Sequence, residues 1–150
     1  MRALFLLGRA MFGGFFVYNG IDHFKHQQML SQYAAQKGTP MPDVAVQVSG
    51  AMLIAAGASI VLGLKPRQGL ATLVACVVPM TIQIHRFWEA KEPQTRANEL
   101  VNFTKNMALV GAALTMMEIR VPWRASVDMA RREEEMYVRL GGRDLRALPV

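Results

Sequence analysis

The chain has 150 residues, of which 52% are hydrophobic and 19% are charged, and its mean hydropathy is +0.18. This composition excludes a disordered chain, and the length indicates one domain instead of several. Lys and Arg outnumber Asp and Glu by 17 to 11, which gives a net charge of +6. Because these charges are grouped between long apolar runs and do not follow one exposed face, nucleic acid is not expected as a partner.

The first two apolar segments predict two transmembrane helices. The segment from Ala3 to Ile21 is broken only by Arg9, and at about 1.5 Å per residue it approaches the roughly 30 Å hydrocarbon core of a bilayer. No cleavage motif of small residues follows it, so we expect it to be retained and not removed as a signal peptide. The segment from Val44 to Leu64 carries no formal charge, and its small residues allow close helix approach.

Two further segments complete the predicted all-α fold, a four-helix transmembrane bundle. The segment from Gly69 to His85 is rich in large apolar residues, and Pro79 within it predicts a kinked helix. The segment from Leu100 to Met117 is ambiguous when taken alone, since its uncharged part is short. A soluble four-helix bundle is the alternative, but the stretch from Met52 to Leu64 lacks the polar outer face that such a bundle needs.

The distribution of Lys and Arg predicts the orientation of the bundle. Most of them lie at the N-terminus, in the turn from Lys65 to Gln68 and after Met117. The two longer connections, Asp22 to Asp43 and Arg86 to Glu99, hold few of them and balance these with carboxylates. We therefore expect both termini in the cytoplasm and the longer connections outside, in the inner (cell) membrane of a bacterium.

The chain is predicted to divide into a transmembrane domain at residues 1–117 and a basic cytoplasmic tail at residues 118–150. Ala125 to Leu140 are mostly good helix formers, and Gly141 and Gly142 provide a stop, which predicts a short amphipathic or solvated helix in the tail. The basic residues of the tail serve either as a positive-inside anchor or as a docking surface for a cytoplasmic partner.

The predicted topology gathers polar residues at the outer end of the bundle. Glu99, Asn102 and Asn106 share one face of the fourth helix, with Lys105 on the flank of that face. A Lys at this depth is costly in hydrocarbon unless it snorkels or meets a counter-ion, for which Asp22 and Glu99 are the nearest. The candidate ligand-binding residues and their polar supports are Arg9, His85, Asn102, Lys105, Asn106, Asp22, His23 and Glu99.

This polar cluster has two interpretations. Lys105 and Asn106 either form a structural network that fixes helix packing or bind a small polar or amphipathic ligand. Arg9 is expected to face the interior, where a helix carbonyl, a polar group or Glu118 would pair with it, in a structural or a functional role. His85 stands either in an aromatic belt at the membrane interface or in the ligand site.

Metal and thiol chemistry are not expected, and no catalytic residue can be assigned. Cys76 is the single cysteine, which excludes an internal disulfide framework, a paired redox motif and a cysteine-rich zinc site. His23 and His26 are three positions apart, but no metal-binding motif accompanies them. The Gly-x-Ser-x-Gly elbow of many hydrolases does not occur either.

Several short stretches, in this order and spacing, resemble the DoxX family of small four-helix membrane proteins. They are Gly8-Arg9, Asn19 to Phe24, Tyr33 to Pro42, His85 to Trp88 and Glu99 to Leu109. The resemblance runs from about Leu6 to Met117 and implies a four-helix transmembrane bundle. The family is named after a subunit of a thiosulfate:quinone oxidoreductase, and relatives are linked to membrane-associated redox complexes. Many relatives carry a Glu where this chain has Leu53, so a proton-relaying carboxylate at that depth is missing.

Two functions are compatible with these features. The first is an accessory or small subunit of a membrane-bound redox or respiratory-type complex, without catalysis of its own. The second is a quinone-linked oxidoreductase subunit whose outer polar cluster holds a quinone headgroup or a sulfur oxyanion, because cations and amide donors suit such oxygen atoms. The expected partners are the lipid bilayer and a larger membrane complex. The small residues from Gly50 to Ala58 would serve internal packing or a homo-oligomer equally well.

Overall fold

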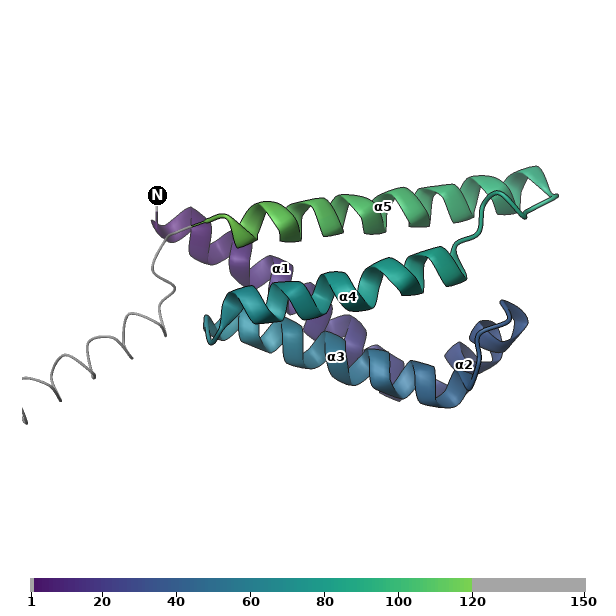
Figure 1. Ribbon diagram of the computed structural model, residues 1–150, viewed down its shortest axis with the longest axis horizontal. Helices are drawn as coiled ribbons and strands as arrows, with labels where there is room; N and C mark the ends of the chain where they lie inside the picture. The colour runs from purple at the N-terminus through teal and green to yellow at the C-terminus, as the bar shows by residue number, and fades with distance from the viewer. Residues whose placement is uncertain (1, 120–150) are drawn as a thin grey trace, which may run out of the picture.

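A computed structural model of the chain describes residues 2–119, and all regular structure within them is α-helical, as predicted. Four helices are long and one is short (Figure 1). They are α1 (Arg2–Lys25), α2 (Gln27–Gln36), α3 (Pro42–Leu62), α4 (Pro66–Ile84) and α5 (Pro93–Met117). The helix predicted within the tail lies outside the described residues.

The four long helices run between two distinct ends of the molecule. The N-terminus, the turn between α3 and α4 and the last turn of α5 lie together at one end (Figure 1). α2 and the connection between α4 and α5 lie at the opposite end. This is the arrangement expected of helices that cross a bilayer one after another. We refer to the end that carries α2 as the α2 end.

Three of the described helices are long and apolar enough to cross a membrane, namely α1 over Ala3–Lys25, α3 and α4. These three match the first three predicted spans. α5 has 25 residues but does not reach the same mean hydropathy, because polar and charged residues occupy much of its first half. A fourth span through α5 therefore stays a prediction.

The connection from Asp22 to Asp43 contains a helix that we did not predict from the sequence. α2 packs mainly against α3, and to a lesser extent against α1, through its buried side chains Ser31 and Ala34. Polar and apolar residues are mixed along it, so it lacks the apolar run that marks the other helices. Leu30 and Ala34 are nonetheless four positions apart, the spacing of one helix face.

Local signals set the ends of the long helices. Proline occupies the first turn of α3, α4 and α5, where its fixed φ suits a helix and its missing N–H has no intrahelical partner to lose. Glu92 caps α5 by accepting hydrogen bonds from the backbone N–H groups of Gln94 (2.8 Å) and Thr95 (2.5 Å). Gly63 ends α3 in the left-handed conformation, at φ 72°.

α1 and α3 approach so closely that only glycine fits at their contact. A Cβ atom added at Gly57 would lie 2.5 Å from the carbonyl oxygen of Gly13, and one added at Gly20 would lie 2.7 Å from that of Gly50. The small residues that the sequence offered for either packing or oligomerisation are thus used here within one chain, at Gly50 and Gly57.

Candidate functional site

A cavity of about 670 Å³ lies near the α2 end, and all five described helices contribute to its wall. This volume falls within the range of sites that bind small molecules. The wall is mainly apolar. Its polar side chains are Asn19, His23, Tyr33, Thr39, Ser49, Cys76, Gln83, His85, Lys105 and Asn106.

Polarity changes along the cavity. On α1, His23 lines it near the end of the helix, whereas Phe16 lines it seven residues earlier, or about 10 Å deeper. α4 repeats the pattern, since His85 caps its last turn and Val77 lies deeper. The cavity therefore offers polar groups near the α2 end and an apolar surface further in, which suits an amphipathic molecule.

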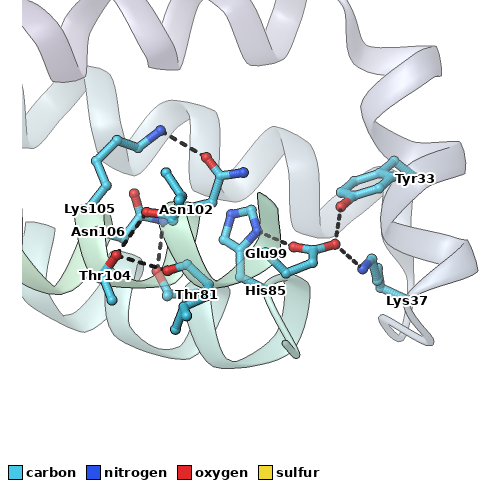
Figure 2. Close-up of polar contacts among 11 residues, drawn as sticks. Tyr33, Lys37, Thr81, His85, Glu99, Asn102, Thr104, Lys105 and Asn106 are labelled. Atoms are coloured by element: carbon cyan, nitrogen blue, oxygen red, sulfur yellow. Dashed lines mark hydrogen bonds and ion pairs between the residues drawn. The ribbon is translucent and has the colours of Figure 1, made fainter. Parts of the chain in front are cut away.

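Glu99 on α5 is the hub of the polar groups at the α2 end (Figure 2). Its carboxylate accepts a hydrogen bond from Tyr33 Oη at 3.1 Å and forms an ion pair with Lys37 Nζ at 2.5 Å, both through Oε1. Its Oε2 lies 2.8 Å from Nδ1 of His85. Glu99 is 7% exposed. Three segments of the chain thus converge on one buried carboxylate.

The surroundings of Glu99 keep it ionised at neutral pH. Burial alone raises the pKa of its carboxyl, but the hydrogen bonds from Lys37, His85 and Tyr33 together outweigh burial and hold this pKa below its usual value. Burial likewise lowers the pKa of the Lys37 ammonium, while Glu99 and Tyr33 raise it, and the net result is a raised pKa. The pair is therefore a carboxylate and an ammonium under ordinary conditions.

A further hydrogen bond ties the segment after α2 to α4. The side-chain amide of Gln83 donates to the backbone carbonyl of Lys37 at 3.0 Å. Together with the contacts of Tyr33 and Lys37 to Glu99, it fastens α2 across the end of the cavity, to α4 on one side and to α5 on the other. We call these contacts the α2 tether.

Deeper in the bundle, α4 and α5 are joined by a second polar contact. The amide nitrogen of Asn106 donates to the hydroxyl of Thr81 at 3.0 Å, and Thr81 is fully buried (Figure 2). Asn106 also lines the cavity. Because an amide nitrogen carries two N–H groups, one remains for a ligand after Thr81 is bound.

Lys105 does not meet the counter-ions expected from the sequence. Its ammonium donates to Oδ1 of Asn102 at 3.1 Å. Of the two predicted partners, Asp22 pairs with His26 at 2.8 Å, and Glu99 is taken by Lys37 and His85. Asn102 precedes Lys105 by one turn, so the ammonium is drawn back toward the α2 end, as expected for a snorkelling lysine.

His23 and Arg9 occupy different parts of α1. Nδ1 of His23 lies 3.0 Å from the hydroxyl of Ser49 and 3.3 Å from the carbonyl oxygen of Val46, so this residue both lines the cavity and joins α1 to α3. Arg9 is 5% exposed, as expected for an interior position, and its guanidinium lies 6.0 Å from the ring centroid of Phe5. It stands 14 residues before His23, about 20 Å away along the helix.

The structure thus sorts the eight candidate residues into three groups. His23, His85, Lys105 and Asn106 line the cavity, and Glu99 supports it through His85. Arg9, Asp22 and Asn102 lie outside its wall. Four further residues of these polar contacts were not among the candidates predicted from the sequence, namely Tyr33, Lys37, Thr81 and Gln83. Among residues 2–119, no three His, Cys, Asp or Glu side chains are grouped so that they could hold a metal ion.

Comparison with known proteins identifies the family. A sequence model of the DoxX family matches residues 4–86, which is more than half of the chain. The chain belongs to the DoxX family. It is similar to the inner membrane protein YphA of Escherichia coli (strain K12), with 30% identity over 97 residues, which cover 65% of this chain and 68% of YphA. No solved structure matches it.

The family match confirms the resemblance read from the sequence and makes this chain a membrane protein of the DoxX family. The matched region contains α2 to α4 and all but the first two residues of α1, and it ends at Arg86, so it includes His23 and His85 of the cavity wall. The α5 residues Glu99, Lys105 and Asn106 follow it.

Proposed function

We propose that this DoxX-family protein holds a quinone-like amphipathic molecule in its cavity and acts as a small subunit of a larger membrane complex. The observation that carries this proposal is the cavity of about 670 Å³, whose wall is apolar in depth and polar at the α2 end. A quinone has the matching form, with carbonyl oxygens on a ring and an apolar tail. In this proposal the chain supplies the binding site, and the partner complex donates or accepts the electrons.

His85 and Asn106 are the groups proposed to bind the headgroup. Nδ1 of His85 is engaged by the Glu99 carboxylate, which leaves Nε2 for a ligand. Nε2 accepts a hydrogen bond from a quinol hydroxyl when the ring is neutral and donates one to a quinone carbonyl when the ring is protonated. The second amide N–H of Asn106 can donate to the same headgroup, while Phe16, Leu53 and Leu109 line the part suited to an apolar tail.

The accessory role without a ligand is the competing function. It is supported by the fact that Glu99 and Asn106 already have partners within the protein, so both serve helix packing. It leaves unexplained why the bundle keeps an apolar cavity beneath these groups. We therefore propose binding as the function and packing as the way in which the binding groups are fixed.

The proposed location is the inner membrane of a bacterium, with both termini in the cytoplasm. The similar protein YphA is described as an inner membrane protein. The basic residues Lys65 and Arg67 lie at the end of the bundle that also holds the N-terminus, which the positive-inside rule places in the cytoplasm. The cavity and α2 would then lie in the outer half of the membrane.

Mass spectrometry of the protein extracted from its native membrane in mild detergent tests the binding proposal. We expect stoichiometric quinone and co-purifying subunits with the wild type, and at least a tenfold loss of quinone in Asn106→Leu. The matched control is Asn98→Leu, which makes the same change at an exposed position of α5 outside the cavity wall. A complex that co-purifies intact but carries no quinone would leave only the accessory role.

A further inference from the structure

The cavity occupies a wedge between two pairs of helices. α1 packs most extensively against α3, α4 contacts α3 and α5 to similar extents, and α5 contacts mainly α4, so we group α1 with α3 and α4 with α5. Toward the α2 end, α4 and α5 separate from α3 and from the last turns of α1 (Figure 1). Residues from both pairs line the space between them.

The sides of this wedge are open at the level of the membrane-crossing helices. Phe15 on α1 and Val48 on α3 both line the cavity, yet 43% and 51% of their surfaces are exposed. Pro79 on α4 and Lys105 on α5 are likewise exposed residues of the wall. Along the membrane-crossing helices, exposed wall residues of this kind mark lateral mouths of the cavity. Because α1, α3 and α4 can each cross a membrane, the mouths at Phe15, Val48 and Pro79 face lipid.

The α2 end of the wedge is covered by α2 and the segment that follows it. On α2, Ala34 lines the cavity and is only 5% exposed, whereas the wall residues Tyr33, at 37%, and Pro40 are exposed. The α2 tether fixes this lid to both helices of the opposite pair, through Glu99 on α5 and Gln83 on α4. Water-soluble molecules at the α2 end therefore have to pass the tethered α2 segment.

We infer that the ligand reaches the cavity sideways from the lipid phase, between the α1–α3 pair and the α4–α5 pair, while the tethered α2 excludes molecules from the aqueous side. This inference rests on the proposed function and narrows it. A membrane-dissolved molecule such as a quinone can follow this route, whereas a hydrophilic sulfur oxyanion cannot cross the hydrocarbon that surrounds the mouths. Of the two headgroups considered, the site takes the quinone.

Cys76 provides a reporter for the route, because it is the only cysteine of the chain, lines the cavity and is 6% exposed. The full chain is reconstituted in liposomes and treated with a lipid-soluble maleimide or with a charged, membrane-impermeant thiosulfonate. We expect the maleimide to modify Cys76 at least ten times faster than the charged reagent does. Cys76→Ser gives the background for both reagents.

Release of α2 should change the result for the charged reagent alone. Glu99→Gln removes the charge that binds Lys37, and we expect a several-fold rise in thiosulfonate labelling with little change for the maleimide. Tyr33→Phe deletes one hydrogen bond of the same tether and serves as a milder variant if Glu99→Gln fails to fold. Glu89→Gln is the matched control, because Glu89 is exposed and meets only Arg86 among the described contacts.

Two outcomes would overturn the inference. One is equal labelling of the wild type by both reagents, which would mean that the aqueous side is open. The other is labelling by neither reagent in the folded protein, with full labelling after unfolding in detergent, which would mean that the sides are closed. Since no quinone is present, the route stands or falls separately from quinone binding, which the mass-spectrometric experiment decides.

Discussion

The contact between α1 and α3 and the contact between α2 and α5 are made by opposite means. α1 meets α3 with glycine facing backbone at two levels, seven residues apart on each helix. α2 meets α5 only through long polar side chains that converge on the carboxylate of Glu99. The first contact depends mainly on shape, with one polar contact at His23, and the second depends on charge. The protein thus combines a rigid pair of helices with a cover that a single proton or substitution can loosen.

The largest effect is expected at the glycine contacts between α1 and α3. Gly57→Ala places a Cβ atom 2.5 Å from the backbone oxygen of Gly13 and 2.9 Å from the backbone nitrogen of Val17, and backbone cannot move aside as a flexible side chain can. We expect a loss of about 3 kcal/mol in the free energy of unfolding, the upper end of the range for overpacking. Thermal unfolding in detergent, followed by size-exclusion chromatography, measures it.

Gly14→Ala is the control for this change. Gly14 also lies within α1, but an added Cβ atom there has no atom within 4 Å. The substitution should be neutral or slightly stabilising, because alanine favours a helix over glycine. Equal stability of the two variants would show that α1 and α3 are less closely packed than described here.

The same contrast explains which parts of the fold were predictable. The long apolar runs and the small residues of α3 are local features of the sequence, so three spans and the close helix contact follow from them. α2 has no such run. It is held by packing on α3 and by its tether to α5. Tertiary contacts of this kind are not visible in the local pattern, although the spacing of Tyr33 and Lys37 fits one helix face.

An intermediate effect is expected at the α2 tether. Glu99→Gln keeps the shape of the side chain but removes the charge that attracts Lys37 and His85. Hydrogen bonds to charged groups contribute about 2 kcal/mol, and we expect α2 to open more readily by that amount. Hydrogen exchange of the backbone amides in Gln27–Gln36 should accelerate about 30-fold, while exchange in α3 stays unchanged.

The pH dependence of the tether gives an independent check of this assignment. Because the pKa of Glu99 is lowered on folding, its contribution to stability is complete above its usual pKa of 4.5 and is lost as the pH falls through the lowered value. The wild type should therefore approach the exchange behaviour of Glu99→Gln in acid. Exchange in α2 that remains equally slow in both proteins would contradict the role given to Glu99.

The candidate site was predicted only in part, because spacing along one helix is a local feature of the sequence and contacts between helices are not. Helical spacing placed Asn106, Lys105 and Glu99 near one another on α5, and the topology brought His85 and His23 to the same end. Sequence spacing does not show which group each side chain chooses across the bundle. Asp22 or Glu99 was expected to meet Lys105, but the partners of Glu99 come from the unpredicted α2 region and from the end of α4. Arg9 was included for its charge, although its depth puts it far from the cavity.

The smallest effect is expected at the hydrogen bond between α4 and α5. Thr81→Val keeps the volume of a fully buried side chain but removes the hydroxyl that accepts from Asn106. Interhelical hydrogen bonds in membrane proteins couple by about 0.6 kcal/mol on average, because unfolded helices in a membrane also find partners. A double-mutant cycle of Thr81→Val and Asn106→Leu, measured by unfolding without quinone, should return a coupling of this size.

Asn98→Leu in place of Asn106→Leu should show no coupling, since Asn98 bonds to Gln94 on its own helix. A zero coupling for Asn106 as well would mean that its amide is free to serve the cavity alone.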